Sequence, residues 1–416
     1  MITASSLCYA FYMLTRNGSA AVYFAGALSA RTADEMSAPA LLLLGMAVLG
    51  SERPASLLFA ALTVASAVGG PLLGALMDRA ARPGLLLALA LGGYAAGLAL
   101  VTTVLGQLGI AMTVAVFTGL LAPSLSGAWT ARLADVLPER LLGRGHSLDA
   151  ATYNVAALAG PAAAGLITGV GTYWAMAATI GLLLLAVPAA LTLPRQQARA
   201  SVAFTADLKA GFVAIVRARG LRRVTVASMV AFLGTGMLIV SCPPLGERYL
   251  GGAGRGGLLL SLLAAGAMVT ATVAARWPPR RQPESVFTIA AVGIAFGLAG
   301  LAVAPNASVL VVAALLAGAG EGPQLAAVFD IRHREAPARL RGQVFTTGAS
   351  LKITAGAVGA ALAGSLPLTF ALGFAAATQL LAAALLIGSG RERARPRGTP
   401  RYLRRPRRST SDSCPR

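Results

Sequence analysis

The chain contains repeated apolar stretches of about 20 residues or more, each long enough as a helix to cross a hydrocarbon core about 30 Å thick. Twelve such spans are predicted, at 22–49, 54–76, 84–104, 108–131, 147–168, 173–193, 224–245, 256–276, 286–304, 307–330, 343–365 and 368–389. Only 12% of the 416 residues are charged, about half the share of a typical soluble protein. Because lipid cannot satisfy exposed backbone groups, these spans predict an all-α membrane protein with twelve transmembrane helices.

The basic residues give these spans an orientation. A net charge of +20 would ordinarily indicate nucleic-acid binding, but here the charge is divided among short loops. Thirty of the 35 Lys and Arg residues fall in alternate connections and at the chain ends, whereas the intervening connections hold only Arg53, Arg248 and Arg255. Cytoplasmic loops carry such an excess, so both termini are predicted to be cytoplasmic, in a multi-pass plasma-membrane protein. No nucleic-acid partner is expected.

An internal repeat divides the chain into two halves. A shift of 199 residues aligns PERLLGR at 138–144 with PARLRGQ at 337–343. The alignment continues without a gap, so that Gly160 meets Gly359 and Gly165 meets Gly364. Internal duplication is typical of membrane transporters. The predicted units are two six-helix bundles, at 22–194 and 224–390.

Three other segments complete the predicted organisation: an N-terminal cytoplasmic segment, a cytoplasmic linker and a basic disordered tail, at 1–21, 195–223 and 391–416. Within the linker, apolar residues from Phe204 to Val216 recur at helical spacing, which predicts an amphipathic helix on the inner membrane surface that stops at Gly220. No basic region of a secretory signal precedes the first span, and both Met1 and Met13 stay open as the start.

The loop between the second and third spans carries the first family signature. In GALMDRAARP, residues Gly74, Asp78, Arg79 and Arg82 resemble the loop motif of the major facilitator superfamily, although Ala81 replaces its usual glycine. We expect Gly74 to permit close approach of helices. Asp78 is expected to bind an arginine or a helix N-terminus in one state and release it in another, as part of a conformational switch.

A second resemblance covers residues 137–165, which look like the branch of that superfamily that exports siderophores and drugs. Gly160, Pro161 and Gly165 are similar to a helix-kink motif of family antiporters, with Ala156 in place of a further glycine. The resemblance implies two bundles related by an axis along the membrane normal. It also implies alternating access and a cavity lined largely by helices one, four, seven and ten.

Five ionisable residues fall within the apolar spans: Arg31, Asp34, Glu35, Glu321 and Lys352. Each costs about 2.5 to 3.5 kcal/mol near the bilayer centre unless a partner or water compensates it. We expect Arg31 to pair with Asp34 or Glu35 on its own helix, leaving the other acid to titrate or to meet substrate. Glu321 is expected either to couple protons or contact substrate, or to be neutralised by Lys352.

Weaker signals come from polar residues elsewhere in the spans. Gln324 lies one turn beyond Glu321 and is a candidate for substrate contact. Asn154 is expected either to bridge helices through a hydrogen bond or to bind a ligand. Asp149 and Asp330, near the inner ends of their spans, are expected to join the basic cytoplasmic rim.

Several other kinds of function are excluded. The chain has no GxxxxGK[ST] loop for nucleotide-driven transport, and its two histidines and three cysteines are too scattered for a metal cluster, a disulfide framework or a catalytic constellation. We therefore predict no enzyme activity and no cofactor.

The hypothesis is a secondary active transporter that acts as a monomer in the bilayer and exports a small amphipathic compound, such as a drug, siderophore or metabolite, in exchange for protons. Two alternatives stay open. One is an importer or lipid flippase on the same fold, and the other is a non-transporting membrane sensor or scaffold whose tail binds a partner.

Overall fold

The computed structural model describes residues 18–195, 204–276, 282–337 and 340–387. Almost all of them are helical, and the described helices fall into two bundles joined by a linker. The predicted tail at 391–416 and the chain up to residue 17 lie outside the described residues.

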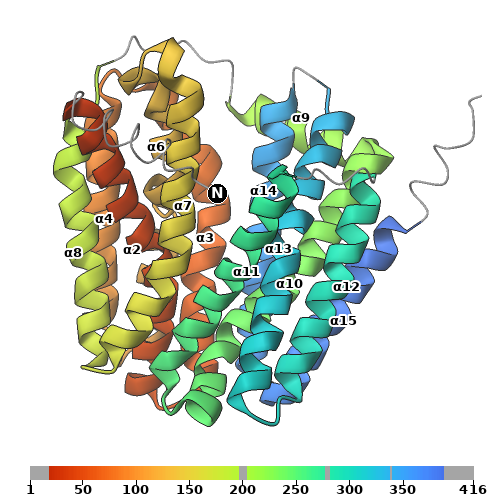
Figure 1. The fold of residues 1–416 in the computed structure, drawn as a ribbon. Helices are drawn as coiled ribbons and strands as arrows, with labels where there is room; N and C mark the ends of the chain where they lie inside the picture. The colour runs from red at the N-terminus through yellow and green to blue at the C-terminus, as the bar shows by residue number, and fades with distance from the viewer. Residues whose placement is uncertain (1–17, 196–203, 277–281, 338–339, 388–416) are drawn as a thin grey trace, which may run out of the picture.

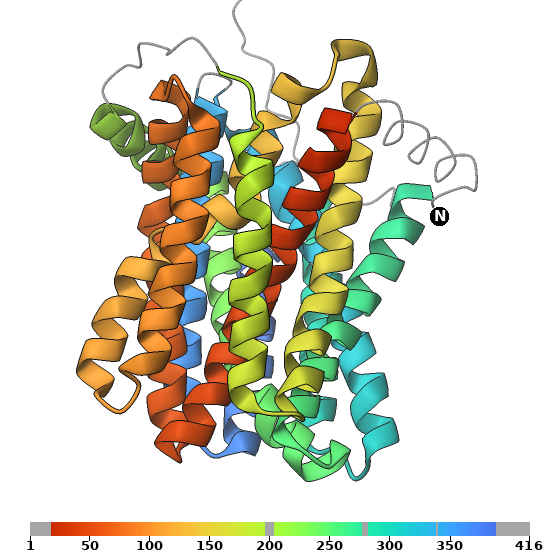
Figure 2. The same ribbon diagram turned by 90° about the vertical axis from the view of Figure 1, so that its left-hand side faces the viewer.

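The N-terminal bundle is formed by α2 (Gly18–Leu49), α3 (Glu52–Arg79), α4 (Pro83–Thr103), α5 (Leu108–Gly119), α6 (Pro123–Val136), α7 (Glu139–Thr168) and α8 (Thr172–Leu191). Helix α2 packs against both α7 and α8, and Figure 2 shows it running obliquely between them. Helix α4 packs on α8 and α3 packs on α5. A single apolar cluster joins these helices, with Trp129 and Tyr94 among its fully buried residues.

The C-terminal bundle is formed by α10 (Arg219–Leu250), the 3₁₀ turn η1 (Ala253–Arg255), α11 (Gly256–Arg276), α12 (Pro283–Ala302), α13 (Ala307–Glu335), α14 (Arg341–Ala363) and α15 (Leu368–Leu386). Eleven spans among the described residues are long and apolar enough to cross a membrane. Helix α14, which includes Lys352, is not one of these eleven; it corresponds to the eleventh predicted span, at 343–365, and packs between α10 and α3. Large apolar side chains such as Phe296 and Phe370 are exposed on the outer surface, as a lipid-facing helix requires.

The fourth predicted span, at 108–131, is not one continuous helix. It is divided into α5 and α6 at residues 120–122, just before Pro123. Proline has no N–H and cannot continue an α-helical ladder. The chain instead makes short i→i−3 bonds, from Leu121 N to Thr118 O (2.9 Å) and from Ser124 N to Leu121 O (3.0 Å).

The two bundles stand side by side, with α3 packed on α14 and α7 packed on α11 (Figure 1). We call the end that bears α9 (Phe204–Arg217) and the connections α3–α4, α6–α7 and α13–α14 the basic end. The other end carries the α2–α3, α7–α8 and α14–α15 connections, and we call it the opposite end. In Figure 1 the bundles come together towards the opposite end.

Close backbone contacts hold the bundles together near the opposite end. A Cβ at Gly165 on α7 would overlap the carbonyl oxygen of Gly254, and one at Gly257 on α11 would overlap that of Pro161. Between α3 and α14, a side chain at Gly364 would overlap Ser56. Only glycine permits such approaches, so these positions close the space between the bundles at this end.

The linker helix α9 lies where the sequence predicts an amphipathic helix, but its predicted end at Gly220 is wrong. Helix α9 ends at Arg217, and Ala218 adopts an extended conformation (φ −83°, ψ 114°) before α10 begins. Gly220 lies in the first turn of α10, where a Cβ would meet the Glu335 side chain. Ile215 is buried with Val344 of α14, so α9 packs on the C-terminal bundle.

Candidate functional site: a cavity between the two bundles

A cavity of about 660 Å³ lies between the bundles. Its described lining residues come from α2, α7, α10, α11 and α13, the first, fifth, seventh, eighth and tenth spans. The expectation of a wall from spans one, four, seven and ten is therefore wrong for span four. Helices α7 and α11 face each other across the seam and form the wall instead, while Ser126 of α6 lies behind the wall and donates to the lining residue Asp34.

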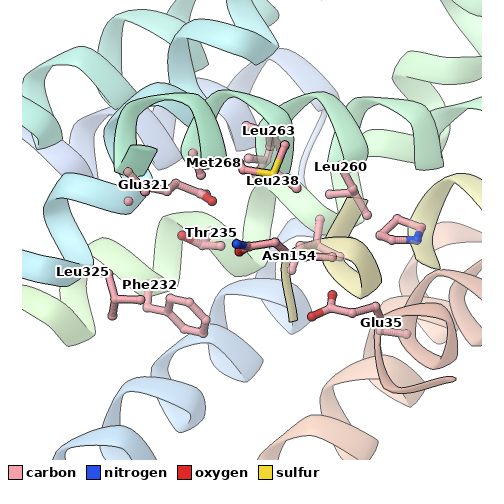
Figure 3. Close-up of a pocket in the computed structure, with 18 of the residues that line it drawn as sticks. Glu35, Asn154, Phe232, Thr235, Leu238, Leu260, Leu263, Met268, Glu321 and Leu325 are labelled. Carbon is pink, nitrogen blue, oxygen red and sulfur yellow. The ribbon is translucent and has the colours of Figure 1, made fainter. Parts of the chain in front are cut away.

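The wall is mostly apolar, with a few polar groups. Asp34, Glu35, Asn154 and Glu321 are among the lining residues, so the cavity brings together four of the residues predicted to couple protons or contact substrate. Figure 3 shows the carboxylates of Glu35 and Glu321 and the amide of Asn154 pointing into the same space. From Glu321 the lining continues along α13 to Phe329, so the cavity extends towards the basic end.

The three carboxylates differ in their partners. Asp34 Oδ2 accepts a hydrogen bond of 2.7 Å from Ser126 Oγ. No hydrogen bond or ion pair joins Glu35 or Glu321 to any other residue in the described part of the chain. The negative charges of Asp34 and Glu321 both act on Glu35, so Glu35 is repelled by an acid of its own helix and by one of the other bundle.

The predicted pairing of Arg31 is wrong. Arg31 Nη1 pairs with Asp149 Oδ1 of α7 at 2.9 Å, and both side chains are buried. Arg31 also donates to Thr130 Oγ1 (2.9 Å) and to the Thr152 hydroxyl, and it lies over the ring of Tyr153, 3.8 Å from the centroid. The carboxylate that pairs with Arg31 therefore comes from the neighbouring helix α7. Asp34 and Glu35, on the same helix as Arg31, form no ion pair with it in the described chain.

Asp149 is therefore not a residue of the basic rim, as predicted, but the centre of a buried network. Its Oδ2 accepts a hydrogen bond of 2.8 Å from Thr130, and Tyr23 donates to its Oδ1 at 3.4 Å. The Tyr23 hydroxyl also lies 2.6 Å from the carbonyl oxygen of Trp129. These contacts fasten α2, α6 and α7 to one another next to the cavity.

Lys352 and Glu321 form no ion pair within 4.0 Å among the described residues, contrary to one of the two predicted alternatives. Lys352 Nζ instead lies over the ring of Phe232, 4.3 Å from its centroid. Phe232 lines the cavity and Lys352 does not, so the ammonium group is outside the wall. Its positive charge still acts on Glu321.

Gln324 also does not line the cavity. Its Nε2 donates to Gln379 Oε1 of α15 at 2.9 Å, and Gln379 Nε2 donates to the carbonyl oxygen of Ala231 on α10 at 3.1 Å. The two amides therefore connect α13, α15 and α10. This arrangement gives Gln324 a packing role in the conformation described.

The helix-kink residues lie at two contacts. Gly160 packs on α2, where a Cβ would come within 2.6 Å of the Cβ of Glu35. Pro161 lines the cavity, and Gly165 makes the close contact with Gly254 described above. The motif therefore touches both the acidic helix of its own bundle and the seam with the other bundle.

The loop signature lies at the basic end. The expected close approach at Gly74 is wrong for the described part of the chain, in which no atom lies within 4 Å of a Cβ built there. Arg79 and Arg82 are exposed, at the end of α3 and the start of α4. The side chain of Asp78 lies outside what the structure describes, so its predicted switching role remains a prediction.

Several residues that shape the site escape sequence analysis. Met268 and Leu260 of α11 line the cavity but look like any apolar residue of a span. Ser126 is one of many small residues in its span, and its role appears only through its bond to Asp34. The sequence does hold a signal for Asp149. Arg31 lies within an apolar span, and a buried arginine requires a carboxylate or comparable acceptors, for which Asp149 is a candidate.

The site contains no arrangement for a resident metal ion. Among the described residues, no group of three or more His, Cys, Asp or Glu could hold one. The carboxylates of Glu35 and Glu321 lie on a mostly apolar wall, where a carboxylate can be protonated or can bind a cation reversibly.

Two bundles of membrane-spanning helices, with a cavity between them that is closed towards one end, define a membrane transporter rather than an enzyme. The chain belongs to the Major Facilitator Superfamily, whose model matches residues 23–364.

Solved structures agree with this assignment. A POT family transporter in complex with a thioalcohol-conjugated peptide is similar at a TM-score of 0.72 and 10% identity, over 90% of this chain and 96% of that one. The nucleoside transporter NupG matches at a TM-score of 0.71 and 13% identity, over 88% and 98% of the two chains. A D-xylose–proton symporter matches at 0.70 and 13%, over 89% and 98%. No curated protein sequence gives a significant match.

Proposed function

We propose that this protein is a proton-coupled exporter of a small amphipathic organic compound, working by alternating access with both termini on the cytoplasmic side of the plasma membrane. The observation that carries the proposal is the placement of acids from both bundles, Glu35 and Glu321, on one cavity. A proton carrier needs carboxylates that can exist in either protonation state, and a carboxylate without a basic partner in an apolar wall has that property.

The conformation supports alternating access. The cavity is closed towards the opposite end by the glycine contacts of α7 with α11, and it extends along α13 towards the basic end. Rocking of one bundle against the other about this site would reverse the closure. Proton coupling occurs on this fold, since one structure similar to this chain is a D-xylose–proton symporter.

The test compares accumulation of a compound panel in cells with and without the protein, at matched membrane expression and with or without a protonophore. For an exported compound, we expect lower accumulation with the protein and recovery with the protonophore. Single changes Asp34→Asn, Glu35→Gln and Glu321→Gln are then compared with Glu247→Gln, which removes an exposed carboxylate at the opposite end.

The outcomes separate the candidate functions. Loss of gradient-driven transport in at least one cavity variant, but not in Glu247→Gln, supports proton coupling through the cavity. Unchanged transport in all three cavity variants contradicts it. Higher accumulation with the protein would identify an importer. A scaffold would transport nothing, and deletion of residues 391–416 would abolish its function.

A further inference from the structure

We propose that the cavity binds an organic cation with an apolar body, held between the carboxylates of Glu35 and Glu321. The inference rests on the proposed transport function and names the chemical class of its substrate. It follows from the sign of the charge on the wall, the position of the acids and the nature of the remaining surface.

All the ionisable side chains among the described lining residues are acidic. Asp34, Glu35 and Glu321 line the cavity, and no Lys, Arg or His is among the described lining residues. The two nearby bases are engaged outside it, because Arg31 pairs with Asp149 at 2.9 Å and Lys352 lies over Phe232 at 4.3 Å. An anion entering this space would be repelled by acids whose neighbouring bases lie outside the wall, whereas a cation would relieve the repulsion on Glu35.

The two acids with no hydrogen-bond partner in the described chain face each other from different bundles. Glu35 lies on α2 and Glu321 on α13, and Figure 3 shows both carboxylates directed into the cavity, with the Asn154 amide between them. Asp34 differs, because Ser126 already donates to it. A cation bound here would therefore contact both bundles, the placement that lets occupancy influence their relative movement.

The remaining wall suits an apolar body rather than a bare ion. Leu238 of α10 and Leu260, Leu263 and Met268 of α11 form a continuous apolar side. A cavity of about 660 Å³ is the size of typical small-molecule sites. No group of three acidic or other metal-binding residues in the described chain converges as a metal ion requires, which favours a larger cation.

The same carboxylates can serve the proton and the substrate. A cation binds the ionised form, so protonation of Glu35 or Glu321 would release it. The charged groups that act on these two acids are Asp34 on α2 and Lys352 on α14, in addition to each other, and the Cys242 thiol of α10 lies within reach of the Glu321 charge. Competition between proton and cation for one site would give exchange of the two across the membrane.

The experiment is equilibrium binding of radiolabelled tetraphenylphosphonium to the purified full-length protein in detergent. Tetraphenylborate, an anion of the same shape, is the matched competitor. The variants are Glu35→Gln and Glu321→Gln, with Glu247→Gln as the exposed control. We expect saturable cation binding that weakens about tenfold or more in each cavity variant, because each removes one counter-charge from a largely apolar site, and that also weakens as pH falls. Tetraphenylborate should not displace the cation, and Glu247→Gln should bind like the parent protein.

Two results would overturn the inference. One is binding of tetraphenylborate as tight as that of tetraphenylphosphonium, and the other is equal cation binding in the parent and both cavity variants. Size-exclusion elution and thermal melting of each variant identify any loss of folding, and Glu321→Asp, which keeps the charge, should retain binding if Glu321→Gln loses it. If the compound panel shows transport of neutral or anionic compounds only, the cation class is wrong while the transport function stands. If nothing in the panel is transported, the transport function itself is wrong.

Discussion

Each bundle buries an arginine, but the groups that accept hydrogen bonds from the two arginines differ. In the N-terminal bundle, Arg31 has a carboxylate partner, Asp149, at 2.9 Å and further hydroxyl acceptors. In the C-terminal bundle, the equally buried Arg332 donates to the hydroxyl of Ser228 at 3.2 Å, and no ion pair joins it to another described residue. One interior therefore contains a neutralised pair and the other an arginine with a neutral acceptor.

The internal repeat shows where this difference arises. The residue 199 positions after Asp149 is Gly348, so the second half has no carboxylate at the equivalent point. The guanidinium of Arg332 occupies that space instead, with its Cζ 2.6 Å from where a Cβ of residue 348 would lie. The repeat has kept the loop and the helix framework but has changed the interior charges. The interior of the first half holds an excess of acids, whereas in the second half the bases Arg332 and Lys352 match the acids Glu284 and Glu321 in number.

The two bundles also contribute unequal numbers of acids to the cavity wall. The N-terminal bundle contributes Asp34 and Glu35 to the wall, whereas the C-terminal bundle contributes only Glu321. The bases of the C-terminal bundle, Lys352 and Arg332, are not among the described lining residues but act on each other electrostatically. A proton or cation entering the cavity therefore meets acids from both bundles, while these two bases lie outside the described wall.

The largest effect is expected from breaking the buried pair of the N-terminal bundle. Asp149→Asn keeps the shape of the side chain but leaves Arg31 without a counter-charge, which should destabilise the protein by about 3 to 5 kcal/mol. The measurement is the midpoint of SDS-induced unfolding in mixed micelles. Glu247→Gln is the control, because Glu247 is exposed at the opposite end, so its loss should cost less than about 0.5 kcal/mol.

A double variant tests whether the lost stability comes from the unpaired charge of Arg31. Replacing both partners, as Arg31→Met with Asp149→Leu, removes the uncompensated charge and should recover a large part of the lost stability. If Asp149→Asn melts like the parent protein, the pair does not hold α2 to α7 in solution, and the contrast between the bundles fails.

A smaller effect is expected from the amide network of the C-terminal bundle. Gln324→Leu removes the donor to Gln379 Oε1 and leaves that buried oxygen unsatisfied, at a cost of about 1 to 2 kcal/mol in the same unfolding measurement. The control is Gln107→Leu, an exposed glutamine at the start of α5, where a change within about 0.5 kcal/mol is expected.

The same variant tests whether Gln324 contacts substrate. Because Gln324 does not line the cavity, the affinity for a transported compound should change less than about tenfold, or 1.4 kcal/mol. A larger loss of affinity with unchanged stability would restore the role in substrate binding that its position beside Glu321 suggests.

The sequence predicts the framework and part of the site, for different physical reasons. Hydrocarbon forces long apolar helices, so the spans can be read directly, and it makes intramembrane acids such as Asp34 and Glu321 conspicuous. The partner of Arg31 is a matter of packing between α2 and α7, which local spacing does not encode. Asp149 lies near the start of its span, so in the sequence it resembles a charged loop residue. Gln379 is uncharged, so nothing in the sequence distinguishes it from other polar residues of the spans.

The smallest effect is expected at Lys352. Lys352→Met preserves the stem of the side chain and removes only a cation above the Phe232 ring, a contact that contributes about 0.5 to 1 kcal/mol and is offset by relief of a buried charge. The unfolding midpoint should therefore move by less than about 1 kcal/mol, far less than with Asp149→Asn. The decisive measurement is a double-mutant cycle of Lys352→Met with Glu321→Gln. A coupling energy of about 0.5 kcal/mol, the lower end of the range for interacting groups, is expected because the charge of Lys352 acts on Glu321 but no ion pair joins the two residues in the described chain. Coupling of about 2 kcal/mol or more would show that Lys352 neutralises Glu321 in solution, and the C-terminal bundle would then hold a paired interior like its partner.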